Sequence, residues 1–227
     1  MELGIVGLGK MGLNMALRLL EGGHKVIAYD HHPENLNILT KNGGQPVTSV
    51  AALVKAVTPP RCLWLMIGAG KATESTVQEL AKILNQDDIL IDGGNANYHD
   101  SVRRAELLKP HGIYFLDVGT SGGIWGRKLG YCLMIGGDKE PFTRMEPVFK
   151  SLAPKDGYLH TGPAGAGHFT KMIHNGTAVP LYCYFGISLA LESSAGAAAG
   201  AAGTAGAAWM AAGFTLSITP SLSAGCE

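Results

Sequence analysis

The sequence predicts an α/β fold built on a doubly wound parallel sheet, on the basis of three observations. Short apolar runs alternate with helical patterns through the first half of the chain. A glycine-rich turn with glycines at positions 7, 9 and 12 follows the first apolar run and opens the first helical pattern. Asp30 ends the second apolar run. Together these features are typical of a Rossmann-type dinucleotide-binding domain.

The elements follow in order. Apolar runs predict strands at residues 3–6, 26–29, 62–67, 89–91, 113–118, 131–135 and 158–160. Helical periodicity predicts helices at residues 11–21, 33–41, 73–84 and 140–152. A second glycine-rich turn then leads into a helix that carries Lys171, which Pro180 is expected to kink or end. We expect three parts: a dinucleotide-binding domain at 1–161, a turn and remnant of a helical domain at 162–192, and a low-complexity Ala/Gly-rich tail at 193–227.

Composition argues against several function classes. Lys and Arg together number 18, as do Asp and Glu, so no charge excess favours nucleic acid or an anionic membrane. The cysteines at 62, 132, 183 and 226 have neither metal-binding nor Cys-x-x-Cys spacing, which favours a reduced cytoplasmic protein without a metal. The N-terminus shows no secretory signal. Residues 195–213 are Ala or Gly apart from Thr204, Trp209 and Met210, too glycine-rich for a membrane helix.

The glycine-rich turn predicts a site for a dinucleotide. Its first glycine permits a tight turn, the second lets the backbone approach a pyrophosphate, and the third allows close helix–strand packing. The expected contacts come from Gly7, Leu8, Gly9, Lys10, Met11 and Gly12. Asp30 is placed to bind ribose hydroxyls, and no arginine nearby could receive a 2′-phosphate, so NAD is favoured over NADP. The alternatives are a purely structural turn and, for Asp30, a helix N-cap.

The helix after residue 162 suggests acid–base chemistry. Lys171, His174 and Asn175 are spaced i, i+3 and i+4, so they share one helix face. A lysine beside an imidazole and an amide can act as a general base with two polar positioners. The next position on that face is Ala178, which can neither give nor take a proton. The alternative for Lys171 is an ordinary exposed helix lysine.

Four blocks within residues 1–176 resemble the 6-phosphogluconate dehydrogenases of the β-hydroxyacid dehydrogenase superfamily. They are GLGKMG at 7–12, DGGNANYHDSVRR at 92–104, DVGTSGG at 117–123 and the lysine segment, and Asp30 resembles the shorter, NAD-preferring branch. The resemblance implies oxidative decarboxylation of 6-phosphogluconate to ribulose 5-phosphate in the pentose phosphate pathway, with Lys171 as the base. It implies substrate binding by Asn95, Ser121, Gly122, Gly123, Lys171, His174 and Asn175, and further cofactor contacts from Ile67, Ala69 and Asn95.

The chain also departs from the family pattern. The family has Glu-Tyr seven and eight residues after its lysine, where this chain has Ala178-Val179, and no Lys or Arg follows Lys171 to hold a phosphate. We expect the family's helical C-terminal domain to be truncated or replaced, turnover to be impaired, and most of the family's homo-oligomer interface to be missing. Three readings stay open: an enzyme with the family's chemistry, an inactive NAD-binding remnant, or a dehydrogenase of another small β-hydroxy acid.

Overall fold

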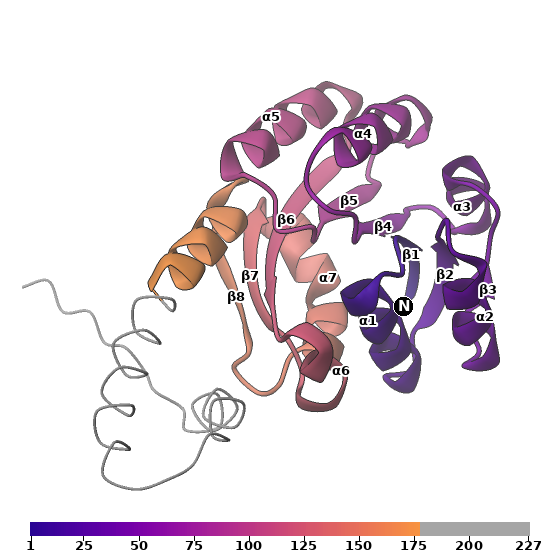
Figure 1. The fold of residues 1–227 in the computed structure, drawn as a ribbon. Coiled ribbons are helices and arrows are strands. Elements are labelled where there is room, and N and C mark those ends of the chain that lie inside the picture. The colour runs from indigo at the N-terminus through magenta and orange to yellow at the C-terminus, as the bar shows by residue number, and fades with distance from the viewer. Residues whose placement is uncertain (178–227) are drawn as a thin grey trace, which may run out of the picture. The chain divides into compact units, whose positions relative to one another are not determined.

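The computed structural model describes residues 1–177, of which residues 1–175 form one mixed α/β unit (Figure 1). The strands are β1 Glu2–Val6, β2 Lys25–Tyr29, β3 Gln45–Pro46, β4 Cys62–Leu65, β5 Ile89–Asp92, β6 Tyr114–Ser121, β7 Cys132–Gly137 and β8 Tyr158–Gly162. The α-helices are α1 Lys10–Glu21, α2 Pro33–Lys41, α3 Val50–Ala56, α4 Lys71–Ile83, α5 Tyr98–Leu108, α6 Gly126–Leu129 and α7 Lys139–Leu152. Two 3-10 helices are η1 Lys109–His111 and η2 Gly123–Trp125. A last helix, the lysine helix, spans residues 166–177.

The strands form one sheet in the order β3-β2-β1-β4-β5-β6-β7-β8. Side chains of alternate residues on the buried strands enter two separate cores. Leu3 of β1 packs with α1, α2 and α7 on one face, and Leu63 of β4 packs with α3, α4 and α5 on the other. Burial on both faces explains why these strands are continuous apolar runs rather than alternating ones. The doubly wound α/β fold is therefore confirmed.

One strand departs from the parallel arrangement. β7 pairs antiparallel with β6, with Ser121 opposite Cys132, a reversal that was not predicted from the sequence. The connection between these strands, residues 122–131, holds only η2 and α6. A parallel crossover needs about a dozen residues or more, so the chain can only turn back here. β8 is again parallel to β7.

The seven predicted strands and five predicted helices, the lysine helix among them, are present, and the ends given for the others are shifted by a few residues at most. The elements not predicted from the sequence are β3, α3, α5, α6 and both 3-10 helices. Residues 1–175 form a compact unit, and the expected domain boundary near residue 161 stays a prediction. The interpretations of Ala178, Val179, Pro180, Cys183, Cys226 and the Ala/Gly tail lie outside the described residues.

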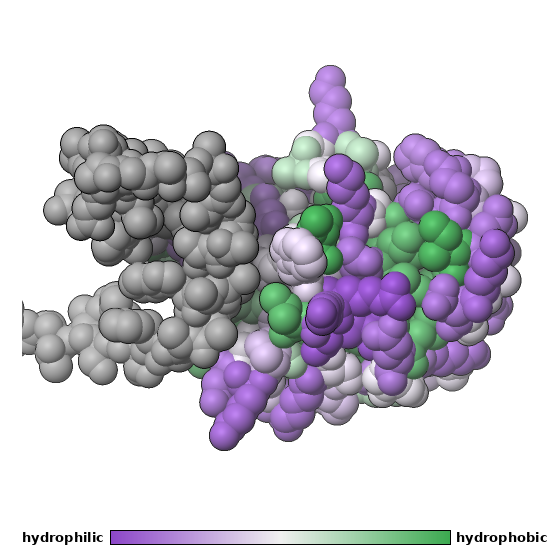
Figure 2. All heavy atoms as spheres, turned by 60° about the horizontal axis from the view of Figure 1, so that its bottom comes forward, coloured by the Kyte–Doolittle hydropathy of each residue, from purple (hydrophilic) through white to green (hydrophobic). Residues whose placement is uncertain are grey.

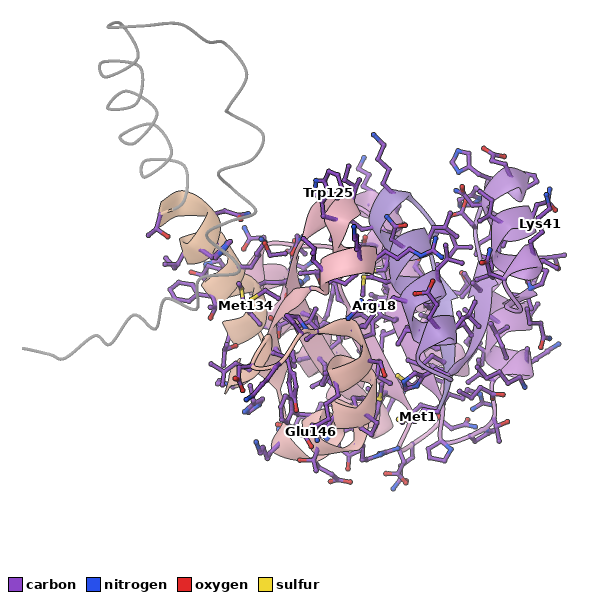
Figure 3. All side chains as sticks on the ribbon, turned by 90° about the horizontal axis from the view of Figure 1, so that it is seen from below. Met1, Arg18, Lys41, Trp125, Met134 and Glu146 are labelled. Carbon is purple, nitrogen blue, oxygen red and sulfur yellow. The ribbon has the colours of Figure 1, made fainter. Side chains whose placement is uncertain are left out.

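On the face shown in Figure 2, the described residues are mainly hydrophilic, with separate apolar areas between hydrophilic side chains. Three exposed apolar residues, Ile124, Trp125 and Leu129, come from η2 and α6. This segment is fastened to α1, because Arg18 Nη1 donates to the carbonyl of Arg127 at 2.8 Å. Figure 3 shows Trp125 at the outer end of this segment, beside α1. The turn that follows β6 is thus held against the helix that follows β1.

Candidate functional site

The glycine-rich turn between β1 and α1 is closed at two of its glycines. Gly7 has a φ of 94°, and its N–H donates to the carbonyl of Tyr29 at 2.9 Å. A Cβ at Gly7 would stand 2.7 Å from the carbonyl oxygen of Met66, and one at Gly12 would collide with the Gly7 carbonyl. Backbone atoms cannot move aside as a flexible side chain can. Only glycine therefore fits where the chain turns and where α1 packs on β1.

The turn is open at Gly9, the N-cap residue of α1. A Cβ there would meet no atom within 4 Å. No side chain caps the helix, and its first turn carries no acidic residue. The first N–H groups of a helix have no partner within it and carry partial positive charge, so they favour an anion. The space above Gly9 and the uncapped helix end fit the pyrophosphate of a dinucleotide.

Asp30 ties the turn to the end of β2. Its carboxylate accepts hydrogen bonds from the N–H of Leu8 and from the N–H of His32, the latter at 2.7 Å. Burial raises the pKa of Asp30, but these N–H donors outweigh burial, so the pKa lies below its ordinary value. His32, not Asp30, is the N-cap of α2, so the N-cap alternative is wrong. Asp30 is a charged carboxylate that fixes the shape of the turn.

The remaining residues expected at the cofactor lie in or beside this turn. Leu8 is fully buried and contributes its backbone N–H, whereas Lys10 is exposed and Met11 half-buried. Ile67 and Ala69 lie in the loop between β4 and α4. That loop follows the strand next to β1, and the N–H of Met66 donates to the carbonyl of Val6 at 2.8 Å. The two loops therefore leave the sheet side by side.

Asn95 lies in the loop after β5 and is locked to β6. Its Nδ2 donates to the carbonyl of Thr120 at 3.2 Å, and the N–H of Thr120 donates to its Oδ1 at 3.0 Å. Its φ of 53° lies in the left-handed region, which asparagine tolerates better than most residues. Asn95 is thus held at Thr120, one residue before Ser121 at the end of β6. The family resemblance implies that Asn95 and Ser121 both bind the substrate.

A buried ion pair that was not predicted from the sequence supports the Asn95 loop. Arg104 Nη1 donates to Asp92 at 2.7 Å, and both side chains are essentially inaccessible. The other Asp92 oxygen accepts from the N–H of Gly94 at 3.0 Å. An acid and an arginine at this spacing are common in sequences, so only the fold reveals that they meet. Breaking such a pair leaves an uncompensated buried charge.

Ser121, Gly122 and Gly123 form the end of β6 and the turn into η2. Gly122 and Gly123 have φ values of 140° and 52°, conformations that side chains rarely adopt. Ser121 is half-buried and lies opposite Cys132 across the antiparallel ladder. Gly119 and Ser121 are two apart on one strand, so they share a face of the sheet. That face is the one that the lysine helix covers.

Lys171 lies against this face. A Cβ added to Gly119 would stand 2.5 Å from the Cβ of Lys171, so the lysine crosses directly over the strand. Lys171 is only 8% exposed, and within residues 1–177 its ammonium group has no hydrogen-bond or ion-pair partner. Burial lowers its pKa, and the nearby Cys132 thiol acts weakly in the opposite sense. The alternative of an ordinary exposed lysine is wrong: this is a desolvated amine.

The other two residues of the predicted face are less buried than Lys171. His174 is half-buried and Asn175 is exposed, and their side chains approach each other at 3.4 Å. The N-terminal end of the helix is fixed differently, by Asp117 of β6. Its buried carboxylate accepts from the N–H of Gly165 at 2.6 Å and of His168 at 2.7 Å.

The fold brings most of the predicted site residues to one edge of the sheet. β1, β4, β5 and β6 run parallel, so the loops that follow them emerge at the same edge. These loops contain Gly7–Gly12, Ile67 and Ala69, Asn95, and Ser121–Gly123. Ligands of open α/β sheets bind at the carboxyl ends of the strands. Lys171, in the lysine helix, packs against Gly119 of β6, beside this edge.

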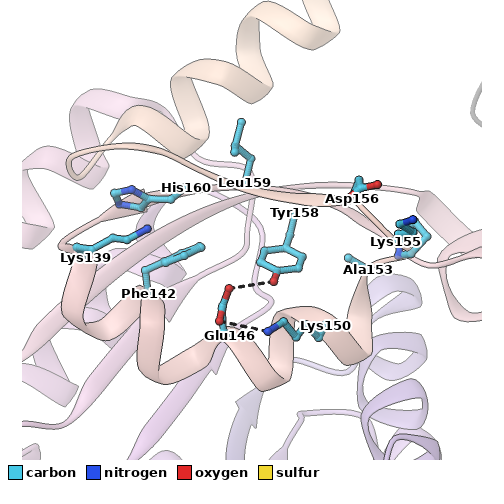
Figure 4. Close-up of a pocket in the computed structure, with 11 residues that line it drawn as sticks. Lys139, Phe142, Glu146, Lys150, Ala153, Lys155, Asp156, Tyr158, Leu159 and His160 are labelled. Carbon is cyan, nitrogen blue, oxygen red and sulfur yellow. Dashed lines mark hydrogen bonds and ion pairs between the residues drawn. The ribbon is translucent and has the colours of Figure 1, made fainter. Parts of the chain in front are cut away.

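A separate hollow lies between α7 and β8 and has a volume of about 570 Å³ (Figure 4). Its lining includes Lys139, Phe142, Glu146, Lys150 and Tyr158. Glu146 is already paired, since it accepts from Tyr158 at 3.0 Å and from Lys150 at 3.3 Å. No predicted site residue lines this hollow, so we place the functional site at the strand ends.

Within residues 1–177, no group of three or more His, Cys, Asp or Glu side chains could hold a metal ion. In the same range, every helix is too short or too polar to cross a membrane.

Known proteins resemble this chain in sequence and in fold. A NAD(+)-dependent, decarboxylating 6-phosphogluconate dehydrogenase of Haloferax volcanii is 41% identical over 187 residues, which cover 82% of this chain and 62% of that protein. Its counterpart in Bacillus subtilis is 38% identical over 183 residues, covering 77% of this chain and 39% of that one. The chain thus spans less than two thirds of the length of either relative.

A solved structure and a family pattern agree with these relatives. The 6-phosphogluconate dehydrogenase of Plasmodium falciparum superposes with a TM-score of 0.72 at 30% identity, over 78% of this chain and 40% of that one. The sequence pattern described as the NAD binding domain of 6-phosphogluconate dehydrogenase matches residues 2–162. That range holds the sheet, the open glycine turn and Asp30. By this domain, the chain belongs to the 6-phosphogluconate dehydrogenase family.

Proposed function

We propose that this chain binds NAD at the Gly7–Gly12 turn and oxidises 6-phosphogluconate, with loss of carbon dioxide, to ribulose 5-phosphate. The main support for this proposal is the buried environment of Lys171. A desolvated amine that has no ion-pair partner within residues 1–177 lies on the sheet face that also carries Ser121, beside the strand ends where a dinucleotide fits. A lysine that must take up and return a proton near neutral pH needs a lowered pKa.

The residues have separable tasks in this proposal. The Gly7–Gly12 turn would hold NAD, which would supply the hydride acceptor for C3 of the sugar acid. Lys171 in its neutral form removes the proton of the C3 hydroxyl, which leaves a 3-keto acid. Ser121 and the neighbouring backbone at Gly122 and Gly123 offer neutral donors to the substrate carboxylate, and Asn95, His174 and Asn175 orient the sugar hydroxyls. Neutral donors suit the carboxylate because it must leave as uncharged carbon dioxide.

The last step asks for an acid. Loss of carbon dioxide leaves an enediol, whose carbon must receive a proton to give the ketose. The family's glutamate for this step corresponds to Ala178, which lies outside the described residues. Absence of a positioned acid costs on the order of 10²–10⁴-fold. We therefore propose slow turnover, and this same residue favours the second candidate, an NAD-binding protein without catalysis.

The cofactor preference follows from Asp30. Its lowered pKa keeps the carboxylate charged, and it accepts N–H donors of the turn itself. A 2′-phosphate brought to this end of β2 would meet like charge, whereas a ribose hydroxyl can donate to the carboxylate. We propose NAD as the cofactor, a cytoplasmic location, and a small-molecule substrate rather than a macromolecular one.

Formation of NADH from NAD, followed at 340 nm, tests the proposal. The wild-type chain should form NADH with 6-phosphogluconate, slowly but above Lys171→Met, and faster than with 3-hydroxyisobutyrate. Lys55→Met, at an exposed lysine of α3 far from the strand ends, is the matched control and should retain the wild-type rate. Equal rates for wild type and Lys171→Met would favour the inactive candidate, and preference for 3-hydroxyisobutyrate would favour a different β-hydroxy acid.

A further inference from the structure

The lysine helix is capped by a residue from a distant part of the chain. Asp117 is fully buried in β6, and its two oxygens accept from the N–H groups of Gly165 and His168 at 2.6 and 2.7 Å. These donors lie at the start of the helix that carries Lys171. A carboxylate at a helix N-terminus satisfies donors that the helix itself leaves unpaired. Lys171 follows His168 by three residues, so it stands one turn above this anchor.

The helix also rests directly on strand backbone. A Cβ at Gly167 would stand 2.5 Å from the carbonyl of Met134, and one at Gly136 would stand 2.7 Å from the N–H of Gly167. At Gly119 the atom met is the Cβ of Lys171, also at 2.5 Å. We call Gly119, Gly136 and Gly167 the glycine seat. Because the seat has no side chains, the helix lies closer to the sheet than ordinary residues would allow.

A second bond ties the same turn to α5. The Ser101 hydroxyl and His168 Nδ1 share a hydrogen bond of 2.7 Å, and both residues are buried. Within residues 1–177 the other ring nitrogen of His168 is buried without a partner. Burying an unpaired acceptor nitrogen costs less free energy than burying an unpaired N–H. We therefore assign the proton to Nδ1, which then donates to Ser101. The first helical turn is thus fixed from β6 and from α5 at once.

We propose that Asp117 is the positioning residue for Lys171. By holding the start of the helix on the glycine seat, it sets how deeply the lysine amine is buried. The inference rests on Lys171 being the base of the proposed function. Asp117 touches no reacting atom in this account; it acts only through the position of the helix.

Loss of the Asp117 carboxylate should change the pKa of the Lys171 amine. The titratable groups around Lys171 are Asp117 of β6, Cys132 of β7, and His168 and His174 of its own helix. If Asp117→Asn frees the helix from its seat, water reaches the amine and its pKa rises toward the ordinary value. If Asp117 acted only through its negative charge, removing that charge would lower the pKa of Lys171 instead. The two explanations therefore predict opposite shifts.

The experiment measures acetylation of Lys171 by trace acetic anhydride as a function of pH, using peptide mass spectrometry on the full chain. Exposed Lys155 serves as the internal reference. Asp88→Asn is the matched control, because Asp88 is equally buried and accepts backbone N–H bonds from Arg61 and Asn85 just before β5 begins. Asp117→Asn should move the labelling midpoint of Lys171 to higher pH, and Asp88→Asn should not move it, although both lower the melting temperature.

An unchanged midpoint in a folded Asp117→Asn chain, or a shift to lower pH, would overturn the inference. If that variant does not fold, Gly119→Ala decides, because its new methyl group pushes the Lys171 Cβ off the seat and should raise the midpoint in the same way. An unchanged midpoint in that variant overturns the inference as well. The readout needs no turnover, so failure to oxidise 6-phosphogluconate would refute the proposed function and leave this test intact.

Discussion

Alanine at Gly9 and alanine at Gly12 should have opposite effects, although the two changes add the same methyl group three residues apart. At Gly12 the new Cβ would stand 3.1 Å from the Met66 Cβ and even closer to the Gly7 carbonyl, well inside the ~3.5 Å optimum of a non-bonded contact. At Gly9 it would meet nothing within 4 Å. The methyl group at Gly12 strains the fold, and the methyl group at Gly9 fills the space left for a ligand.

The sizes of these effects can be worked out. Overpacking against backbone costs about 3 kcal/mol, at the upper end of the usual range because a carbonyl cannot change rotamer. Alanine inside a helix recovers about 1 kcal/mol relative to glycine. Gly12→Ala should therefore destabilise the chain by about 2 kcal/mol, or about 4–8 °C in melting temperature. Gly9 has φ −61° and ψ −173°, which alanine adopts without strain, so Gly9→Ala should stay within about 1 kcal/mol of wild type.

Binding of NADH should show the reverse order. A methyl group at Gly9 displaces the pyrophosphate from the helix N-terminus, and a penalty of about 1–3 kcal/mol corresponds to a loss in affinity of about 5- to 150-fold. The assays are thermal unfolding followed by circular dichroism and NADH titration followed by fluorescence. A Gly9→Ala chain that binds NADH like wild type would refute the assignment of the Gly7–Gly12 turn as the pyrophosphate site. So would one that is as unstable as Gly12→Ala.

Three further outcomes follow from the electrostatics. NADH should bind more tightly than NADPH, and Asp30→Ala should narrow the difference; equal wild-type affinities for the two nucleotides would contradict the NAD assignment. Glu2 has its pKa lowered from 4.5 to about 2, chiefly by the hydrogen bond from Lys25, so it stabilises the fold above about pH 4.5 and this contribution is lost as the pH falls toward 2. Glu2→Gln should therefore lower the melting temperature at pH 6 but not at pH 2, and a pH-independent difference would speak against the pairing. Arg104→Met should cost about 3–5 kcal/mol by leaving Asp92 buried and unpaired, so a change below 1 kcal/mol in urea unfolding would contradict the buried pair.

The strands were predictable because their residues are buried on both faces. The run at β4, for example, places Leu63 and Trp64 in opposite cores, which leaves no polar position to interrupt the pattern. α5 was not predictable in this way. Its inner face carries Ser101 and Arg104, buried polar residues that remove the apolar period of a helix. β3 has only two residues, both exposed, and gives no signal at all.

Some residues of the candidate site were likewise predictable from the sequence, and others were not. The turn at Gly7–Gly12 is local, so its spacing alone predicted which glycines would be tight and which open. The residues that hold the lysine helix are joined by contacts between distant positions: Asp117 and His168 are 51 residues apart, and Ser101 and His168 are 67 apart. Nothing in a single sequence marks such pairs. The burial of Lys171 is likewise a property of the fold rather than of its neighbours in sequence.

In the proposed reaction, a hydride leaves C3 of 6-phosphogluconate at the Lys171 site. The most direct test supplies the chain with NAD and 6-phosphogluconate deuterated at C3, and measures the mass of the reduced nucleotide after long incubation, with Lys171→Met as the blank. We expect NADH one mass unit heavier than normal, with deuterium at C4 of the nicotinamide ring, in amounts above the blank. Unlabelled NADH, or labelled NADH formed equally by Lys171→Met, would contradict the proposed reaction.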